Sequence, residues 1–252
     1  MIKNVKKHYD NLSKIYDDLW FYSSGFVTFM TDHIIQKLAL KETDKVLDLG
    51  AGTGIYSKDI LEKIHFNQPI SCVDLSNEML KNLENHPDIK AIHSDAISFC
   101  SSKNDEFDKV FAKEMFHHLN ILERDILYKS LFNLIKTNGL VGILQLTPTI
   151  EYPLFQDALD YFSKNQIHYK DIEKGLIDAG FSDVQTLFIS YPLEIEKSKY
   201  LNMIANRYMS LLSNYSDEEL QIGIQQVKEK YKNEPIFKFE DTFVMIIGRK
   251  LS

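Results

Sequence analysis

Three glycines, Gly50, Gly52 and Gly54, lie within five residues and are the first sign of chemistry in this sequence. They follow the apolar run Val46–Leu49 and precede a segment with helical periodicity, residues 55–64. Glycine is favoured where the backbone takes a positive φ or closely approaches a ligand, and the amide groups at the start of a helix attract a bound polar group. The spacing therefore predicts a ligand-binding loop between a strand and a helix.

A carboxylate stands at the end of the next predicted strand. Asp74 follows the apolar run at residues 70–73. From this place a carboxylate can accept hydrogen bonds from both hydroxyls of an adenosine ribose. Together with the glycine loop it predicts a nucleoside cofactor, and the alternative is a plain turn beside an acidic loop.

The position of the third glycine bears on which cofactor is bound. A nicotinamide-binding fingerprint has its third glycine five residues after the first. This chain has Ile55 at that position, which disfavours a nicotinamide cofactor. An acidic residue, Asp48, lies within the strand before Gly50. The run from Val46 to Gly54, VLDLGAGTG, resembles the first motif of the class I S-adenosylmethionine-dependent methyltransferases. The resemblance extends over most of the chain and implies S-adenosyl-L-methionine as cofactor. Two alternatives to a methyltransferase remain: a nicotinamide-dependent oxidoreductase, and a protein that binds the cofactor but catalyses no reaction.

The resemblance also implies roles for individual residues. In the family, the carboxylate matching Asp48 helps to hold the methionine amino group, Asp74 binds the ribose, and Asp95 contacts the adenine amino group. These roles fit the chemistry of the groups, because a cationic ammonium needs negative charge nearby and an exocyclic amine needs a hydrogen-bond acceptor. The remaining expected cofactor contacts are the apolar pair Leu75 and Met79, then Ala96, and Lys113 through its backbone.

Two adjacent histidines follow the predicted fourth strand. Residues 107–113 form this strand, and the family resemblance implies that the segment after it passes beside the methyl donor and opens onto the acceptor. His117 and His118 are the candidate catalytic bases, and an exposed or helix-capping histidine pair is the alternative. No metal site is expected, because adjacent side chains diverge and no Cys or His partner shows ligand spacing.

The N-terminus and a later segment supply further candidates. Residues 9–17 resemble the helix that closes over the cofactor in small-molecule methyltransferases, which makes Tyr9 and Tyr16 expected cofactor contacts, or else core residues. Residues 206–210 resemble another segment of such enzymes, in which Arg207 meets an acceptor carboxylate or has a structural role.

Several absences narrow the acceptor. The segment after the fourth strand lacks the Pro-Pro-aromatic run of the enzymes that methylate amino groups of adenine or glutamine. Neither Cys72 nor Cys100 lies near this segment, so it has no nucleophilic cysteine of the kind that cytosine carbon methylation needs. Lys and Arg number 29 against 36 Asp and Glu, a formal charge of −7 that opposes a phosphate backbone. We expect a small-molecule acceptor, no nucleic acid, and O-methylation in preference to N- or C-methylation.

Strands and helices alternate along the first part of the chain, which is typical of a parallel, doubly wound sheet. We predict an α/β, Rossmann-like, mostly parallel seven-stranded sheet with an N-terminal helical lid and a helical insertion before the last strand. One helix is expected over residues 201–212 of that insertion, and a capping box at Ser216 and Glu219 begins another. We expect a single domain over residues 1–252, comprising a cap (1–40), a cofactor-binding core (41–150) and a substrate-side half (151–252) with its insertion at about 195–235.

Composition agrees with an ordinary folded protein. Hydrophobic residues make up 44% and charged residues 26%, and no apolar stretch approaches membrane-spanning length. Two cysteines provide no disulfide framework. We therefore expect a cytoplasmic protein without a membrane partner, acting as a monomer or homodimer.

Overall fold

A seven-stranded sheet forms the centre of the computed structural model, which describes residues 23–102 and 106–251. The strand order is β3-β2-β1-β4-β5-β7-β6, and neighbours are parallel except that β7 runs antiparallel to β5 and β6. This confirms the predicted fold class. The strands are β1 (Val46–Leu49), β2 (Ile70–Asp74), β3 (Ile89–His93), β4 (Phe107–Lys113), β5 (Ile135–Leu146), β6 (Ser182–Glu196) and β7 (Ile236–Arg249).

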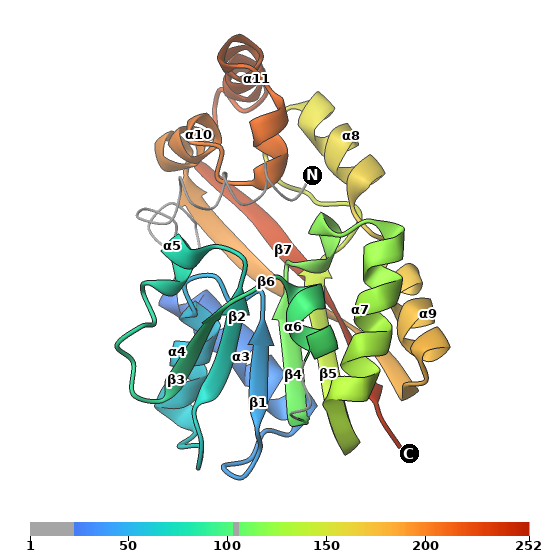
Figure 1. Cartoon of the computed structure of the whole chain (residues 1–252). Helices are drawn as coiled ribbons and strands as arrows, with labels where there is room; N and C mark the ends of the chain where they lie inside the picture. Colours follow the sequence, from blue (N-terminus) through green and yellow to red (C-terminus); the bar gives the residue numbers. More distant parts are fainter. Residues whose placement is uncertain (1–22, 103–105, 252) are drawn as a thin grey trace.

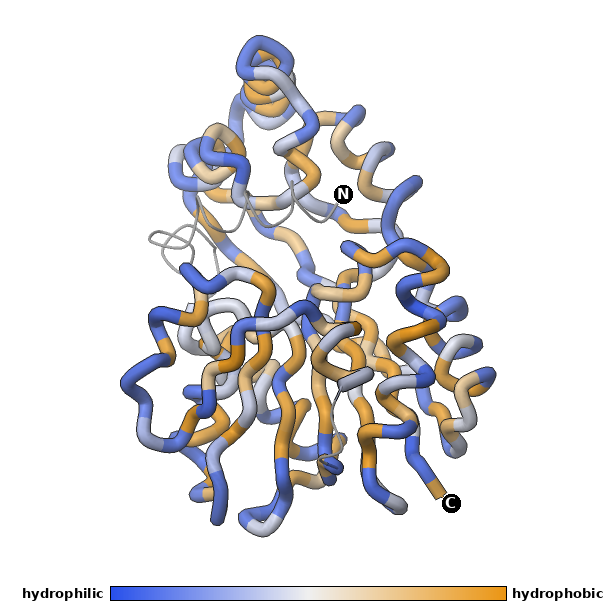
Figure 2. Tube along the Cα trace, viewed as in Figure 1, coloured by the Kyte–Doolittle hydropathy of each residue, from blue (hydrophilic) through white to orange (hydrophobic). Residues whose placement is uncertain are grey.

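Helices cover both faces of this sheet (Figure 1). One apolar cluster joins α3 and α4 to the sheet, and a second joins α6, α7 and α9 to it from the other side. Strands buried on both faces read as continuous apolar runs, as β1 does apart from Asp48, and Figure 2 shows the hydrophobic residues concentrated along the strands. The helices are α3 (Ser24–Leu38), α4 (Ile55–Lys63), α5 (Asn77–Leu80), α6 (Ala96–Ser102), α7 (Ile121–Leu134), α8 (Gln156–Asn165), α9 (Tyr169–Ala179), α10 (Lys197–Ala205) and α11 (Asp217–Lys230), with 3₁₀ turns η1 (Phe116–His118) and η2 (Ser210–Asn214).

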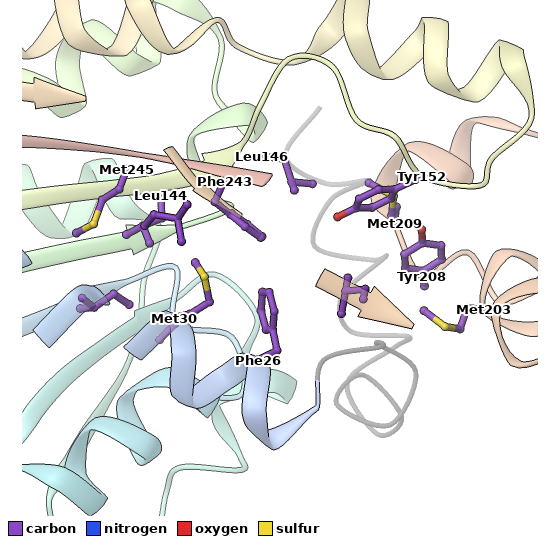
Figure 3. Close-up of a cluster of buried hydrophobic side chains, with 14 of the residues drawn as sticks. Phe26, Met30, Leu144, Leu146, Tyr152, Met203, Tyr208, Met209, Phe243 and Met245 are labelled. Carbon is purple, nitrogen blue, oxygen red and sulfur yellow. The ribbon is translucent and has the colours of Figure 1, made fainter. Parts of the chain in front are cut away.

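The helical insertion lies between β6 and β7, as predicted. These two strands pair as far as Glu196 and Ile236, well past the end of β5, and so carry α10, η2 and α11 beyond the carboxyl edge of the parallel strands (Figure 1). The helix α8, which the sequence did not predict, lies at the same end. Apolar side chains of this region continue the core on the α3 side of the sheet (Figure 3).

Local capping explains where several helices begin and end. The predicted capping box of α11 is confirmed, with the Ser216 hydroxyl accepting from the Glu219 amide and Glu219 reaching back. The prediction of one helix over 201–212 is wrong, because α10 ends at Ala205 and Arg207 has a φ of 54°. A residue in the left-handed region cannot continue a right-handed helix.

The described residues do not include the first predicted helix. Residues 1–22 lie outside them, and with them Tyr9, Tyr16 and the expected lid. Within 23–102 and 106–251, no helix combines the length and apolar character that crossing a membrane requires.

Candidate functional site

The glycine loop connects β1 to α4 at the carboxyl end of the strand. The amides of Gly50 and Ala51 donate to the Val73 carbonyl at 2.8 and 3.0 Å, which fixes the loop against β2. Gly50, Gly52 and Gly54 all have a positive φ, of 79°, 56° and 70°. The sequence prediction of a tight, glycine-dependent loop is therefore confirmed as backbone geometry.

The three glycines differ in what surrounds them. A Cβ on Gly50 would meet the Met115 side chain at 2.8 Å, and one on Gly54 would meet Leu83 at 2.5 Å. Within residues 23–102 and 106–251, a Cβ on Gly52 would meet nothing within 4 Å. Gly50 and Gly54 are thus required by packing within the protein, whereas Gly52 has no such neighbour in this part of the chain, as expected of a ligand-facing glycine.

Asp74 at the end of β2 is held by the glycine loop itself. Its Oδ2 accepts from the Gly52 amide and its Oδ1 from the Ser76 amide, both at 2.8 Å. These two amides fix the orientation of the carboxylate at the end of β2. The position suits the hydroxyls of a ribose.

Asp48 lies beneath the loop rather than on its surface. Its side chain is buried and accepts a hydrogen bond of 2.6 Å from the Ser57 hydroxyl on α4. Burial raises the pKa of Asp48 to about 7, and the nearby Asp74 charge acts in the same direction. A cationic group bound above the loop would favour the ionised form of this carboxyl group.

The remaining expected cofactor contacts lie around β2, β3 and α6. Asp95 accepts from the Ser98 amide at 2.8 Å and so caps α6, which Ala96 begins. Met79 on α5 is buried, and Leu75 directly follows β2. These side chains follow the same carboxyl edge as Asp74, which is the surface an adenosine would need.

The end of β4 brings together charged and aromatic groups. The Lys113 Nζ lies 5.0 Å from the centre of the Tyr56 ring and 4.3 Å from that of Phe243. Burial lowers the pKa of Lys113. The half-buried lysine side chain therefore lies between two aromatic rings at the end of β4.

Glu114, which the sequence analysis did not select, organises this corner. Its φ of 54° turns the chain sharply after β4, and its Oε1 accepts from the Leu146 amide at 2.5 Å. The other carboxylate oxygen lies 3.8 Å from the His117 Nδ1. A non-glycine residue in the left-handed region at the exit of a central strand is a frequent mark of a functional site, but no sequence pattern reveals it.

His117 and His118 form the turn η1. Burial lowers the pKa of His117, and its Nδ1 has no hydrogen-bond partner among the described residues. The two imidazole rings lie 3.9 Å apart at 53°. His117 is thus a half-buried imidazole with a buried Nδ1, it is neutral at pH 7, and Glu114 is the carboxylate beside it.

A second polar group, missed by the sequence analysis, lies on β7. Asp241 is fully buried, accepts a short hydrogen bond from the Tyr152 hydroxyl, and has its pKa raised to about 7 by burial. Nearby, the hydroxyls of Tyr200 and Tyr208 are 2.8 Å apart. The only sequence indication of this buried group was an acidic residue on a strand face whose neighbouring residues are apolar.

Arg207 has a structural role here. Its Nη2 donates to the Tyr215 carbonyl at 3.1 Å and pairs with Asp217 at 2.7 Å. These bonds fix the turn between α10 and η2. In the part of the chain that the structure describes, no three His, Cys, Asp or Glu side chains are grouped to hold a metal ion.

The donor set fits a nucleoside with a cationic tail. Gly52 has no described side chain against it, so a cofactor can approach its backbone closely. Asp74 is a carboxylate of fixed orientation. Asp48 is a buried carboxyl group that a nearby cation would ionise. S-adenosyl-L-methionine, with its ribose, ammonium and sulfonium, has these features.

Comparison with known proteins agrees with this assignment. Residues 46–139 match the methyltransferase domain family. Over 191 residues, which are 70% of this chain and 68% of the relative, the chain is 25% identical to malonyl-[acyl-carrier protein] O-methyltransferase 2 of Ilyobacter polytropus. It is also 26% identical over 174 residues to phosphoethanolamine N-methyltransferase 1 of Arabidopsis thaliana, covering 65% of this chain but only 34% of the plant protein.

A solved structure shows the same fold. The SAM dependent methyltransferase from Archaeoglobus fulgidus superimposes with a TM-score of 0.60 and 20% identity, covering 90% of this chain and 95% of that one. The two relatives methylate different atoms, oxygen and nitrogen by their names, so the similarity leaves the acceptor atom open.

Proposed function

Because the chain belongs to the class I S-adenosylmethionine-dependent methyltransferases, we propose that it methylates a small-molecule metabolite, on oxygen in preference to nitrogen or carbon. The observation that carries the choice of oxygen is the half-buried His117, whose buried Nδ1 lies beside Glu114 at the exit of β4. A hydroxyl acceptor benefits from a neutral base, and lowering of the pKa by burial keeps His117 neutral at pH 7.

The proposed site has two parts along the carboxyl edge of the sheet. The residues proposed to hold the cofactor are Asp48, Gly50, Gly52, Gly54, Asp74, Leu75, Met79, Asp95, Ala96 and the backbone of Lys113, together with Tyr9 and Tyr16 beyond the described residues. The Met115 side chain packs against Gly50. This contact puts the histidine turn directly beside the glycine loop, where an acceptor must meet the methyl donor.

S-adenosylmethionine, when bound, supplies a methyl group on a positively charged sulfur. The protein has to align the acceptor atom behind that methyl group and to exclude water. Glu114, fixed by the Leu146 amide, is positioned to accept from the His117 Nδ1 after a small side-chain rotation. The His117 Nε2 is then free to take the proton of an acceptor hydroxyl, and His118 is the alternative base.

The domain arrangement is part of the proposal. We expect one methyltransferase domain in which residues 1–40 cap the core formed by 41–150, and the insertion at about 195–235 contributes to the acceptor side. The acceptor is a small molecule, and we expect the chain to act as a monomer or homodimer.

The test is transfer of a radiolabelled methyl group to panels of hydroxyl, carboxyl and amine compounds, with the methylated atom identified by mass spectrometry. We expect methyl ethers or esters as products. Exclusive N-methylation would contradict the preference for oxygen. Binding of S-adenosylhomocysteine with no transfer to any compound would favour a binding module over an enzyme.

A further inference from the structure

Asp241 on β7 carries a buried carboxylate oxygen with unmet hydrogen-bonding capacity. The side chain is fully buried, and the Tyr152 hydroxyl donates to its Oδ1. Its Oδ2 has no hydrogen-bond partner within the described residues. Buried polar atoms are nearly always hydrogen-bonded, and a buried carboxylate is especially costly without partners. An oxygen left in this state calls for a donor from outside the described part of the chain.

The position of Asp241 connects it to the exit of β4. Asp241 and Phe243 lie two residues apart on β7 and therefore face the same side of the sheet, and the Lys113 Nζ lies 4.3 Å from the centre of the Phe243 ring. The charges that act on Asp241 are those of Lys113 and Glu114. The free carboxylate oxygen thus belongs to the same corner as the proposed base.

When Asp241 is ionised, carboxylates outnumber cations in this corner. Among the described residues whose charges reach Asp241, Glu114 is a second acid and Lys113 is the one base. A bound ligand with a positive charge would balance the excess. A neutral hydroxyl would satisfy the free oxygen but would leave the charge unbalanced.

Aromatic residues lie near the same side chain. The Tyr152 ring lies 5.1 Å from that of Phe239, and Tyr200 lies 5.7 Å from both Phe239 and Tyr208. Tyr208 belongs to the insertion, and in the view of Figure 3 it is drawn near Tyr152. Aromatic faces combined with a desolvated carboxylate favour an organic ammonium over an anion.

We propose that the methyl acceptor carries a basic amino group and that Asp241 binds it, with Oδ2 accepting a hydrogen bond from the ammonium. This inference rests on the proposed function, since it assigns the acceptor class of the same enzyme. In this proposal the amino group binds the acceptor to the protein, and it is not assigned as the atom that is methylated. Asp241 is accordingly a specificity-determining residue.

The experiment compares three probes of similar shape and different charge: phenethylamine, 2-phenylethanol and phenylacetate. Binding to the full-length protein, saturated with S-adenosylhomocysteine, is measured by calorimetry. We expect phenethylamine to bind at least about tenfold more tightly than the alcohol or the acid. Asp241→Asn keeps an oxygen for the Tyr152 hydroxyl but replaces the free acceptor by a donor, so its affinity for the amine falls about tenfold or more.

Glu240→Gln is the matched control, because it removes the same charge from an exposed neighbour on β7. Its affinity for phenethylamine stays within twofold of the wild type. Equal binding of the amine by Asp241→Asn overturns the inference, as does tighter binding of phenylacetate or of 2-phenylethanol, or binding of none of the probes. S-adenosylhomocysteine binding is measured first, so that failure to bind the cofactor product contradicts the proposed function itself.

Discussion

The two halves of the functional edge are assembled from very different distances along the chain. The proposed cofactor side comprises residues 48–96, and there a bond joins the Gly52 amide to Asp74, 22 residues apart. The proposed acceptor side comprises residues 113–118 with Tyr152, the insertion and Asp241, and there the Tyr152–Asp241 bond spans 89 residues. A nucleotide-binding loop can be carried by a short strand–loop–helix unit, whereas this acceptor side depends on strands brought together by the complete sheet.

The sides also differ in how their charged groups are satisfied. Asp74 receives two backbone amides, and Asp48 a hydroxyl. His117 and Asp241 each retain a buried atom without a partner among the described residues. Groups held in place by hydrogen bonds within the protein suit a fixed cofactor platform, while unsatisfied ones leave binding capacity for a substrate. The cofactor side should therefore tolerate little change, and changes on the acceptor side should alter turnover or specificity.

The largest expected effect tests whether the glycine loop is specific to the cofactor side. Gly52→Val should abolish S-adenosylhomocysteine binding, because a branched residue at a φ of 56° is strained and its side chain fills the open space there. Calorimetry measures the binding, and circular dichroism should show the sheet still folded. Retained affinity in a folded variant would show that the loop is only a turn.

The next prediction tests the base on the acceptor side. His117→Gln should lower turnover by roughly 10²–10⁴-fold while the cofactor affinity stays nearly unchanged. Because burial lowers the pKa of His117, wild-type activity should rise with pH through a midpoint below about 6.5. His118→Gln serves as the control and should retain most of the activity.

Glu114 gives this prediction a second readout. Its charge raises the pKa of His117 against the effect of burial. Glu114→Gln should therefore shift the midpoint of the pH profile to lower pH as well as reduce turnover. An unchanged midpoint would assign Glu114 only to the turn after β4.

The third prediction concerns stability and compares Asp241→Asn with the wild type. With the pKa raised from 3.8 to about 7, the native state holds a proton that the unfolded chain has already released. Ionising Asp241 therefore lowers the free energy of unfolding of the wild type as pH rises through this window, by at most about 4 kcal/mol. The asparagine variant should gain in relative stability from pH 4 to pH 8, as measured by urea denaturation. Asp48, whose pKa is raised to about 7, is present in both proteins and cancels in the difference.

The smallest effect tests the ribose contact. Asp74→Ala should weaken S-adenosylhomocysteine binding by about tenfold, since charge-assisted hydrogen bonds are lost. If these bonds go to the ribose, the variant should also discriminate less between adenosine and 2′-deoxyadenosine. Unchanged discrimination would mean that Asp74 acts only by holding the Gly52 and Ser76 amides.

Much of the cofactor side was predictable because its determinants are local. The order of apolar runs and helical segments predicted β1, α4 and β2, and the glycine spacing predicted the loop between them. The capping box at Ser216 was equally local. The prediction of a continuous helix over 201–212 failed because apolar periodicity does not show that Arg207 takes a left-handed conformation, stabilised through Tyr215 and Asp217.

By itself, the sequence determined the Rossmann-like class, the glycine loop, the acidic residues along it and the histidine pair, all features set by residue type and short spacing. Only the tertiary structure decided that Gly52, alone of the three loop glycines, has no described residue where a Cβ would lie, that Glu114 faces His117, and that Asp241 is buried beside Tyr152. The physical reason is that burial and charge proximity depend on which strands are neighbours. The pairing of β5 with β7 and the long extension of β6 and β7 set those neighbours over nearly the whole length of the chain.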